Sequence, residues 1–261
     1  MNTPTLNSVF LKEISMLYSN QTIDGEKSKN KYADKSIVAF VDILGFSSMI
    51  QSDPKGIKYI PIIERAIANA LTMANITRQI DVGLDYRIFS DNICFWFPLK
   101  FHPLALACML SVLAEFQLGL LLENLFCRGG VAIGYHYASE HTIYGPALVE
   151  AVSLEKTAKH PCIAIANEII EDANLITLSL QTHQYHKIDF DGPWFVNYLG
   201  KIFFIQKEAS LRILEEHRMI IKSKIVEFAD TNNVLLKYKW IANYHNDLIG
   251  MISFKDECTF I

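Results

Sequence analysis

Two aspartates lie next to strand-like runs in a pattern that could bind divalent cations. Asp42 ends the apolar run at 36–41 and precedes a turn at Gly45, and Asp91 lies in the turn-forming triplet SDN at 90–92. An ionised carboxylate at the end of a wholly apolar strand is costly without a partner. Carboxylates are ligands that Mg²⁺ and Mn²⁺ prefer. Taken singly, both aspartates also fit ordinary turn-forming roles.

If the two carboxylates meet, the chemistry they suit is phosphoryl or nucleotidyl transfer. In two-metal chemistry one ion activates the attacking oxygen and the other stabilises the leaving group. The turn at 43–46, with sequence ILGF, follows Asp42 directly. Successive backbone N–H groups in such a turn form an anion-binding concavity, so we expect this turn to receive a triphosphate.

The hydrophobic pattern predicts the elements that must position these residues. It indicates a strand from 36, a helix from 56 to about 78, strands at 84–89 and 93–97, a helix at 104–124 and a strand at 126–137. This βαββαβ order is that of the ferredoxin-like fold. In that fold the first and second strands are parallel, with the third antiparallel between them. The end of the first strand then lies beside the hairpin of the next two, so Asp42 and Asp91 should meet at one edge.

The remaining chain adds helices to this core. The pattern predicts a helix from 146 to about 159, a short strand at 162–166, a helical segment at 167–174 and a helical tail at 208–240. The expected fold class is α+β with C-terminal helices. We expect a leader at 1–35, a catalytic domain at 36–200 and a helical extension at 201–261 packed on the same domain.

Composition restricts the possible partners. The 261 residues are 51% hydrophobic, which excludes disorder for most of the chain, and the net charge of −4 offers no surplus to neutralise nucleic acid. The apolar segment 104–126 contains Glu115, Gln117, Glu123 and Asn124, so we expect a buried helix and no membrane insertion. No secretory signal is recognisable. The five cysteines lack CxxC spacing and suit a reducing cytoplasm.

Four stretches carry a resemblance to a known family. FVDILGFS at 40–47 and RIFSDN at 87–92 resemble the two metal motifs of class III nucleotidyl cyclases. CRGGVAIG at 127–134 is similar to a later strand of that family, and YGPALVEA at 144–151 to the start of its dimer-interface helix. The resemblance covers about residues 36–166. The GPALVEA sequence, the helical tail and KYKW at 237–240 are most similar to the pyrimidine cyclases of Pycsar anti-phage systems.

The resemblance implies roles for individual residues. Asp42 and Asp91 would hold two Mn²⁺ or Mg²⁺ ions per site, with the Ile43 carbonyl as a third protein ligand. Phe46 would lie in the phosphate-facing turn. Arg87 would occupy the position of a base-selecting lysine, where its larger, permanently charged group suits a pyrimidine; it also fits a solvated hairpin charge.

The sequence departs from the family at two positions. The usual ribose-orienting Asn and transition-state Arg would fall at Val149 and Ser153. Charge on the α-phosphate still requires a donor. The candidates are Arg128, which we expect to be catalytic, and Lys156 with Lys159, three apart on one predicted helix face.

The resemblance implies a cytoplasmic homodimer that converts UTP to 3′,5′-cyclic UMP and pyrophosphate, with the product acting on a separate effector during phage infection. CTP is the nearest alternative substrate, followed by ATP or GTP. Val149 and Ser153 also admit a catalytically silent nucleotide-binding dimerisation module. A polymerase-palm relative is a third interpretation, which the modest basic content disfavours.

Overall fold

A computed structural model describes residues 33–76, 83–101, 104–172, 183–189 and 192–261. The strands are β1 Asp34–Ile43, β2 Asp85–Phe89, β3 Asn92–Pro98, β4 Cys127–Ala138, β5 Ile143–Tyr144, β6 Ile163–Ile165, β7 Tyr185–His186 and β8 Phe195–Val196. The α-helices are α2 Phe46–Ser52, α3 Tyr59–Met73, α5 Ala105–Leu122, α6 Pro146–Thr157, α7 Asn167–Glu171, α9 Lys207–Glu227 and α10 Asn232–Met251, and 3-10 turns lie at Leu99–Phe101, Gly200–Phe203 and Lys255–Glu257.

The sheet has the strand order β2-β3-β1-β4-β6-β8-β7, and β5 pairs with β4 outside that path. Strand β1 pairs antiparallel with both β3 and β4, and β2 pairs antiparallel with β3. The first and second strands are therefore parallel with the third between them. The expected ferredoxin-like βαββαβ core is confirmed.

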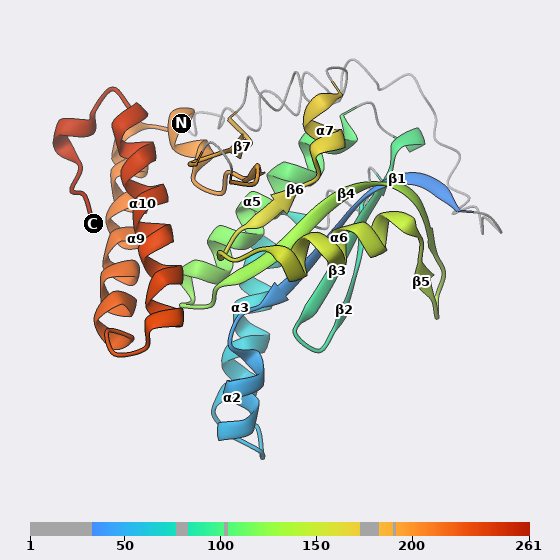
Figure 1. The fold of residues 1–261 in the computed structure, drawn as a ribbon, viewed down its shortest axis with the longest axis horizontal. Helices are drawn as coiled ribbons and strands as arrows, with labels where there is room; N and C mark the ends of the chain where they lie inside the picture. The colour runs from blue at the N-terminus through green and yellow to red at the C-terminus, as the bar shows by residue number, and fades with distance from the viewer. Residues whose placement is uncertain (1–32, 77–82, 102–103, 173–182, 190–191) are drawn as a thin grey trace, which may run out of the picture.

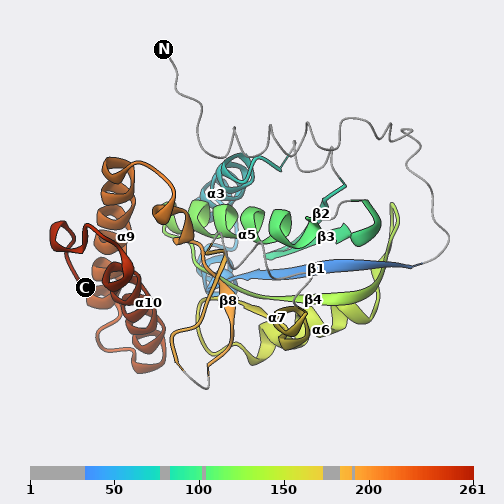
Figure 2. The same ribbon diagram turned by 90° about the horizontal axis from the view of Figure 1, so that it is seen from above.

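Helices cover both faces of the sheet (Figure 2). Helices α3 and α5 pack on one face, and α6 packs on the other against β4 and β1. Successive side chains of β1 point to opposite faces of the sheet, which explains this two-sided burial. Ile37, Ala39 and Val41 belong to the core beneath α3 and α5. Val38 packs on the other face with Ala147 of α6.

Helix α5 is apolar because it is enclosed by two cores. Its mean hydropathy is 2.0, and 67% of it is buried inside the protein, as expected for a core helix. One side packs on α3 and the sheet; Leu118 and Leu121 belong to a second core with α9 and α10. Glu115 of this helix lies 3.6 Å from the Lys201 ammonium, and the Gln117 side-chain amide donates to the Pro161 carbonyl.

The C-terminal extension is a helical hairpin of α9 and α10 beside the end of α5 (Figure 1). The prediction of one helical stretch at 208–240 is wrong in this respect. The chain leaves the first helix at Phe228, turns with a bond from Thr231 N–H to the Phe228 carbonyl, and re-enters a helix at Asn232. The second helix continues to Met251, beyond the expected end.

Other boundaries also differ from the sequence prediction. Strand β1 begins at Asp34, two residues before the expected start, and the unpredicted short helix α2 follows Gly45. The helix predicted at 56–78 spans Tyr59–Met73, and its predicted last residues, 77–78, lie outside the described residues. Residues 1–32 of the leader and 173–174 of the predicted helical segment also lie outside them.

Candidate active site

Strand register places Asp42 between two polar residues. Asp42 is opposite Asn92 of β3 and opposite Arg128 of β4. Directly opposed residues in antiparallel strands project from the same face of a sheet. Because Val38, four residues earlier in β1, packs with Ala147 of α6, this is the face that α6 covers.

Asp91 is held against the end of β1 by its own backbone. It lies in the two-residue turn between β2 and β3, where Ser90 has a φ of 60°. The Ile43 N–H donates to the Asp91 carbonyl at 3.1 Å, and the Asn92 side-chain amide donates to Asp91 Oδ1 at 3.1 Å. The structure thus brings Asp42 and Asp91 to one edge of the sheet, as expected.

Arg128 lies between two acidic side chains. Its Nε is 3.4 Å from Asp42 Oδ2 and 2.5 Å from Oε1 of Glu155 on α6. The shorter contact lacks the alignment of a hydrogen bond, so it is a charge contact. Glu155, a residue that is 4% exposed, was not among the site residues predicted from the sequence.

A glycine allows α6 to bring Glu155 this close. A Cβ at Gly130 would lie 2.3 Å from the Ala151 carbonyl oxygen and 2.5 Å from Leu154 Cβ, so the helix backbone rests directly on β4 at this point. Gly130 follows Arg128 by two residues in the same strand. The close approach therefore sets how near α6 lies to the Arg128 side chain.

The surroundings of Asp42 disfavour its ionised form. Burial is the largest cause, followed by repulsion from Asp91 and Glu155, and together these outweigh Arg128 and raise the pKa of Asp42 from 3.8 to about 6. The carboxylate therefore carries a negative charge that the protein alone stabilises poorly. A divalent cation would supply the missing positive charge.

The residues present fit the two-metal site that the resemblance implies. Two carboxylates at a sheet edge match Mg²⁺ sites, which take one or two carboxylates and complete their shells with substrate phosphates and water. Asp42 and Asp91 would hold the ions, with the Ile43 carbonyl beside them. Among the described residues, no three His, Cys, Asp or Glu side chains are grouped to hold a metal ion by themselves.

Cation binding should depend on pH because a proton and a cation compete for Asp42. With its pKa at about 6, the apparent Mn²⁺ affinity should be constant above about pH 7 and fall roughly tenfold per unit well below 6. Titration calorimetry at several pH values measures this. An affinity that is unchanged from pH 7.5 to about 5 would contradict the assignment.

The raised pKa of Asp42 also determines how the stability of the metal-free protein changes with pH. Since the folded pKa of about 6 exceeds the ordinary 3.8, Asp42 contributes stability below about pH 4, and that contribution is lost as the pH rises through 6. Asp42→Asn should remove this pH dependence, which thermal melts of the two proteins compare.

The phosphate-facing turn is only partly available as an anion site. The Leu44 N–H already donates to the Phe126 carbonyl, just as the Ile43 N–H donates to Asp91. The expectation that successive N–H groups of the turn at 43–46 face a triphosphate therefore does not hold for its first two residues, whose amides are already hydrogen-bonded. The Phe46 side chain packs against the main core beside Ile50 and Ile63.

Arg87 lies on β2, on the same face as Asp42, since it is opposite Cys94, which is opposite Phe40. Its guanidinium donates to the Ser139 carbonyl at 2.6 Å, just beyond the end of β4. Arg87 is thus partly buried and fixed to the backbone, which does not match a freely solvated hairpin charge.

The two positions that depart from the family lie on the outer side of α6. Val149 is 69% exposed, and Ser153 and Lys156 are exposed with it. Lys159 follows the end of the helix at Thr157, so the expectation that Lys156 and Lys159 share a helix face is wrong.

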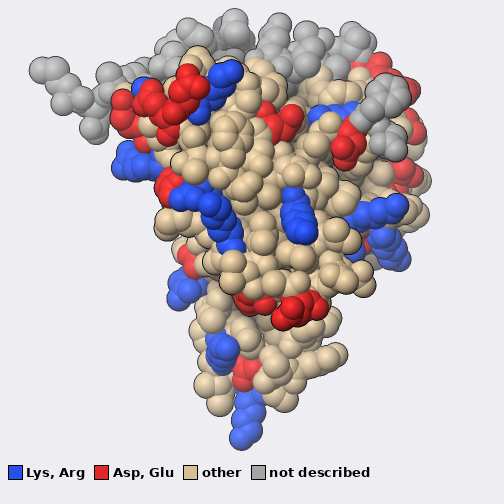
Figure 3. Space-filling model, turned by 60° about the vertical axis from the view of Figure 1, so that its left-hand side comes forward, with Lys and Arg blue, Asp and Glu red and all other residues tan. Residues whose placement is uncertain are grey.

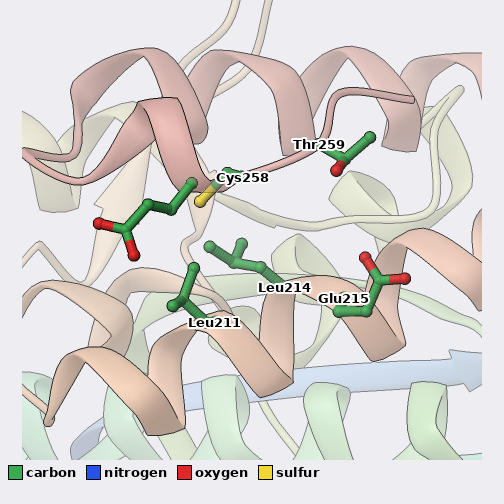
Figure 4. Close-up of a pocket in the computed structure, with 6 residues that line it drawn as sticks. Leu211, Leu214, Glu215, Cys258 and Thr259 are labelled. Atoms are coloured by element: carbon green, nitrogen blue, oxygen red, sulfur yellow. The ribbon is translucent and has the colours of Figure 1, made fainter.

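Two hollows among the described residues have neither Asp42 nor Asp91 in their lining. An apolar groove of about 380 Å³ runs between α2, α3 and the end of β2; it is lined by Phe46, Ile50, Ile60, Ile63, Ile67, Leu71 and Ile88, among others. A cavity of about 210 Å³ lies between α9 and the C-terminal segment (Figure 4), where Leu211 and Leu214 face Cys258 and Thr259. On the side where α9 and α10 lie, the acidic and basic side chains of the described residues are interspersed (Figure 3).

The chain is similar to solved structures of nucleotide cyclases. The adenylyl cyclase CyaB from P. aeruginosa is 17% identical, with a TM-score of 0.42 over 63% of this chain and 94% of that one. The guanylyl cyclase Cya2 is 15% identical, with a TM-score of 0.39 over 63% and 93%. A bacterial light-regulated adenylyl cyclase is 14% identical, with a TM-score of 0.37 over 71% and 98%. No family model and no curated protein matches the chain.

Proposed function

We propose that this protein is a nucleotidyl cyclase that converts UTP to 3′,5′-cyclic UMP and pyrophosphate. The observation that carries the proposal is the meeting of Asp42 and Asp91 at one edge of a ferredoxin-like sheet, each within a stretch that resembles a class III metal motif. Bound Mn²⁺ or Mg²⁺ would activate the ribose 3′-hydroxyl and stabilise charge on the triphosphate.

The chain's own groups would orient the substrate for in-line attack on the α-phosphate. The backbone of the turn at Gly45 and Phe46 lies directly after the metal-binding strand, where a triphosphate tail would extend. Arg87, held by Ser139 on the face that Asp42 shares, would contact the base. Arg128, the remaining catalytic candidate, adjoins Asp42 and would limit negative charge at the reacting phosphate.

The test is direct. Purified protein is incubated with Mn²⁺ and each of the four ribonucleoside triphosphates separately, and the products are identified by mass. Cyclic UMP from UTP is the expected product; cyclic CMP from CTP would support the cytidylate alternative. If no nucleotide is cyclised, the enzyme proposal fails.

The active enzyme would be a homodimer with its site at the interface. The outer side of α6 presents Val149 to solvent, and the nearby Tyr144 of β5 is also exposed, which suits a second copy more than water. A partner could also supply the group that Ser153 does not provide.

Mixing two inactive variants tests that arrangement. Asp42→Asn and Arg87→Met chains should each be inactive, and their mixture should recover up to about a quarter of the wild-type activity if Asp42 and Arg87 of one site come from different subunits, because half of the randomly paired dimers then keep one intact site. Each variant mixed with itself is the control. A mixture that stays as inactive as its components would place both residues of a site on one chain.

The alternative is a catalytically silent nucleotide-binding dimerisation module. It is favoured by Val149 and Ser153, which replace a ribose-orienting and a charge-stabilising group. Saturable binding of a triphosphate without any cyclic product would select it. As an active cyclase, the protein would work in the cytoplasm and signal through a separate effector during phage infection.

A further inference from the structure

Glu155 is a buried acid that the proposed reaction has not used. Its side chain is 6% exposed, and its Oε1 has no hydrogen-bond donor, although it touches Arg128 Nε at 2.5 Å. Burying a carboxylate in this way is costly unless a cation lies beside it. Arg128 is that cation, so the two side chains are held together.

Arg128 also forms a second, longer ion pair with Asp42, a candidate metal ligand. The distance from its Nε to Asp42 Oδ2 is 3.4 Å, compared with 2.5 Å to Glu155. A guanidinium and a divalent cation would compete for the same carboxylate, because both are attracted by its charge. The position of Arg128 therefore decides how accessible Asp42 is to a metal ion.

We propose that Glu155 is a positioning residue that draws the Arg128 guanidinium toward itself, so that Arg128 pairs only loosely with Asp42 and that carboxylate stays available to a divalent cation. This inference rests on the proposed function, in which Asp42 binds the cation. Glu155 acts through Arg128 and does not itself contact the metal ion.

The packing explains why Glu155 holds the guanidinium more closely than Asp42 does. Glu155 is more deeply buried than Asp42, whose side chain is 19% exposed, so losing its partner would cost Glu155 more. Helix α6 is fixed by its contact with β4 at Gly130, which keeps Glu155 in place. Asp42, at the sheet edge, can exchange Arg128 for a metal ion.

The experiment measures Mn²⁺ binding to the metal-free full-length protein by titration calorimetry, without nucleotide. Glu155→Gln should weaken binding about tenfold or more, because Arg128 then pairs more closely with Asp42. Adding Arg128→Met to that variant should restore the affinity to within about threefold of wild type. Arg128→Met alone should change the affinity much less. Glu216→Gln, an exposed change of the same kind on α9, is the matched control and should have no effect.

Each outcome decides between explanations. Equal Mn²⁺ affinity of Glu155→Gln and wild type would overturn the inference. So would an equal effect of Arg128→Met on the affinity in wild type and in Glu155→Gln, because Glu155 would then contribute only its charge. Where Glu155→Gln does not fold in thermal melts, Glu155→Asp keeps the charge but shortens the reach; it should weaken binding if position matters and leave it unchanged if only charge does. If wild type binds no Mn²⁺, or binds it equally after Asp42→Asn, the metal assignment itself fails.

Discussion

Asp42→Asn should abolish cyclisation and at the same time make the metal-free protein more resistant to heat. Activity should fall by roughly 10³-fold or more, because a metal ligand that stabilises transition-state charge by several kcal/mol is lost. Stability should rise at neutral pH because the asparagine removes a charge that burial, Asp91 and Glu155 all disfavour, as the raised pKa of Asp42 shows.

A loss of activity together with a higher melting temperature would distinguish the loss of a metal ligand from simple misfolding, which lowers both. Asp230→Asn is the control, since Asp230 is exposed in the turn between α9 and α10 and should alter neither quantity. An Asp42→Asn protein that is as active as wild type in the cyclase assay would remove Asp42 from the site. One that melts well below wild type would contradict the electrostatic account.

Gly130→Ala should destabilise the protein by about 1–3 kcal/mol and reduce activity, because the added methyl group has no room. It would meet the Ala151 carbonyl and Leu154 of α6, and backbone atoms cannot rotate away as a side chain can. The helix must move outward, and Glu155 moves with it.

Gly134→Ala is a closely matched control in the same strand under the same helix. A Cβ there would lie 3.5 Å from Ala147 Cβ, which is ordinary contact, so its effect should stay within about 0.5 kcal/mol. Urea unfolding measures both variants. Equal stabilities would show that α6 does not rest on Gly130, and the placement of Glu155 would then lack its explanation.

The convergence of Asp42 and Asp91 was predictable from the sequence because it depends on strand order and register alone. The apolar run of β1 and the turn at 90–92 identify the strands, and the βαββαβ order places their ends together. Backbone pairing of these strands is then enough to bring the two aspartates together, and no knowledge of side-chain packing is required.

Glu155 was missed because its role depends on how α6 lies on the sheet. A signal was present: Ala147, Ala151 and Glu155 recur every four residues and form the buried stripe of that helix. A glutamate in a stripe of alanines indicates a buried partner. The partly used amides at 43–46 were harder to foresee, because they depend on how far β1 stays paired beyond Asp42.

Helix α5 has a consequence for how the protein is made. Its side with Leu118 and Leu121 belongs to a core that α9 and α10 complete, and these two helices are synthesised after the rest of that core. Before α9 and α10 emerge from the ribosome, that apolar surface is only partly covered, which favours self-association. We therefore expect a chain truncated before α9 to aggregate or to depend on chaperones, and not to fold as a smaller stable domain.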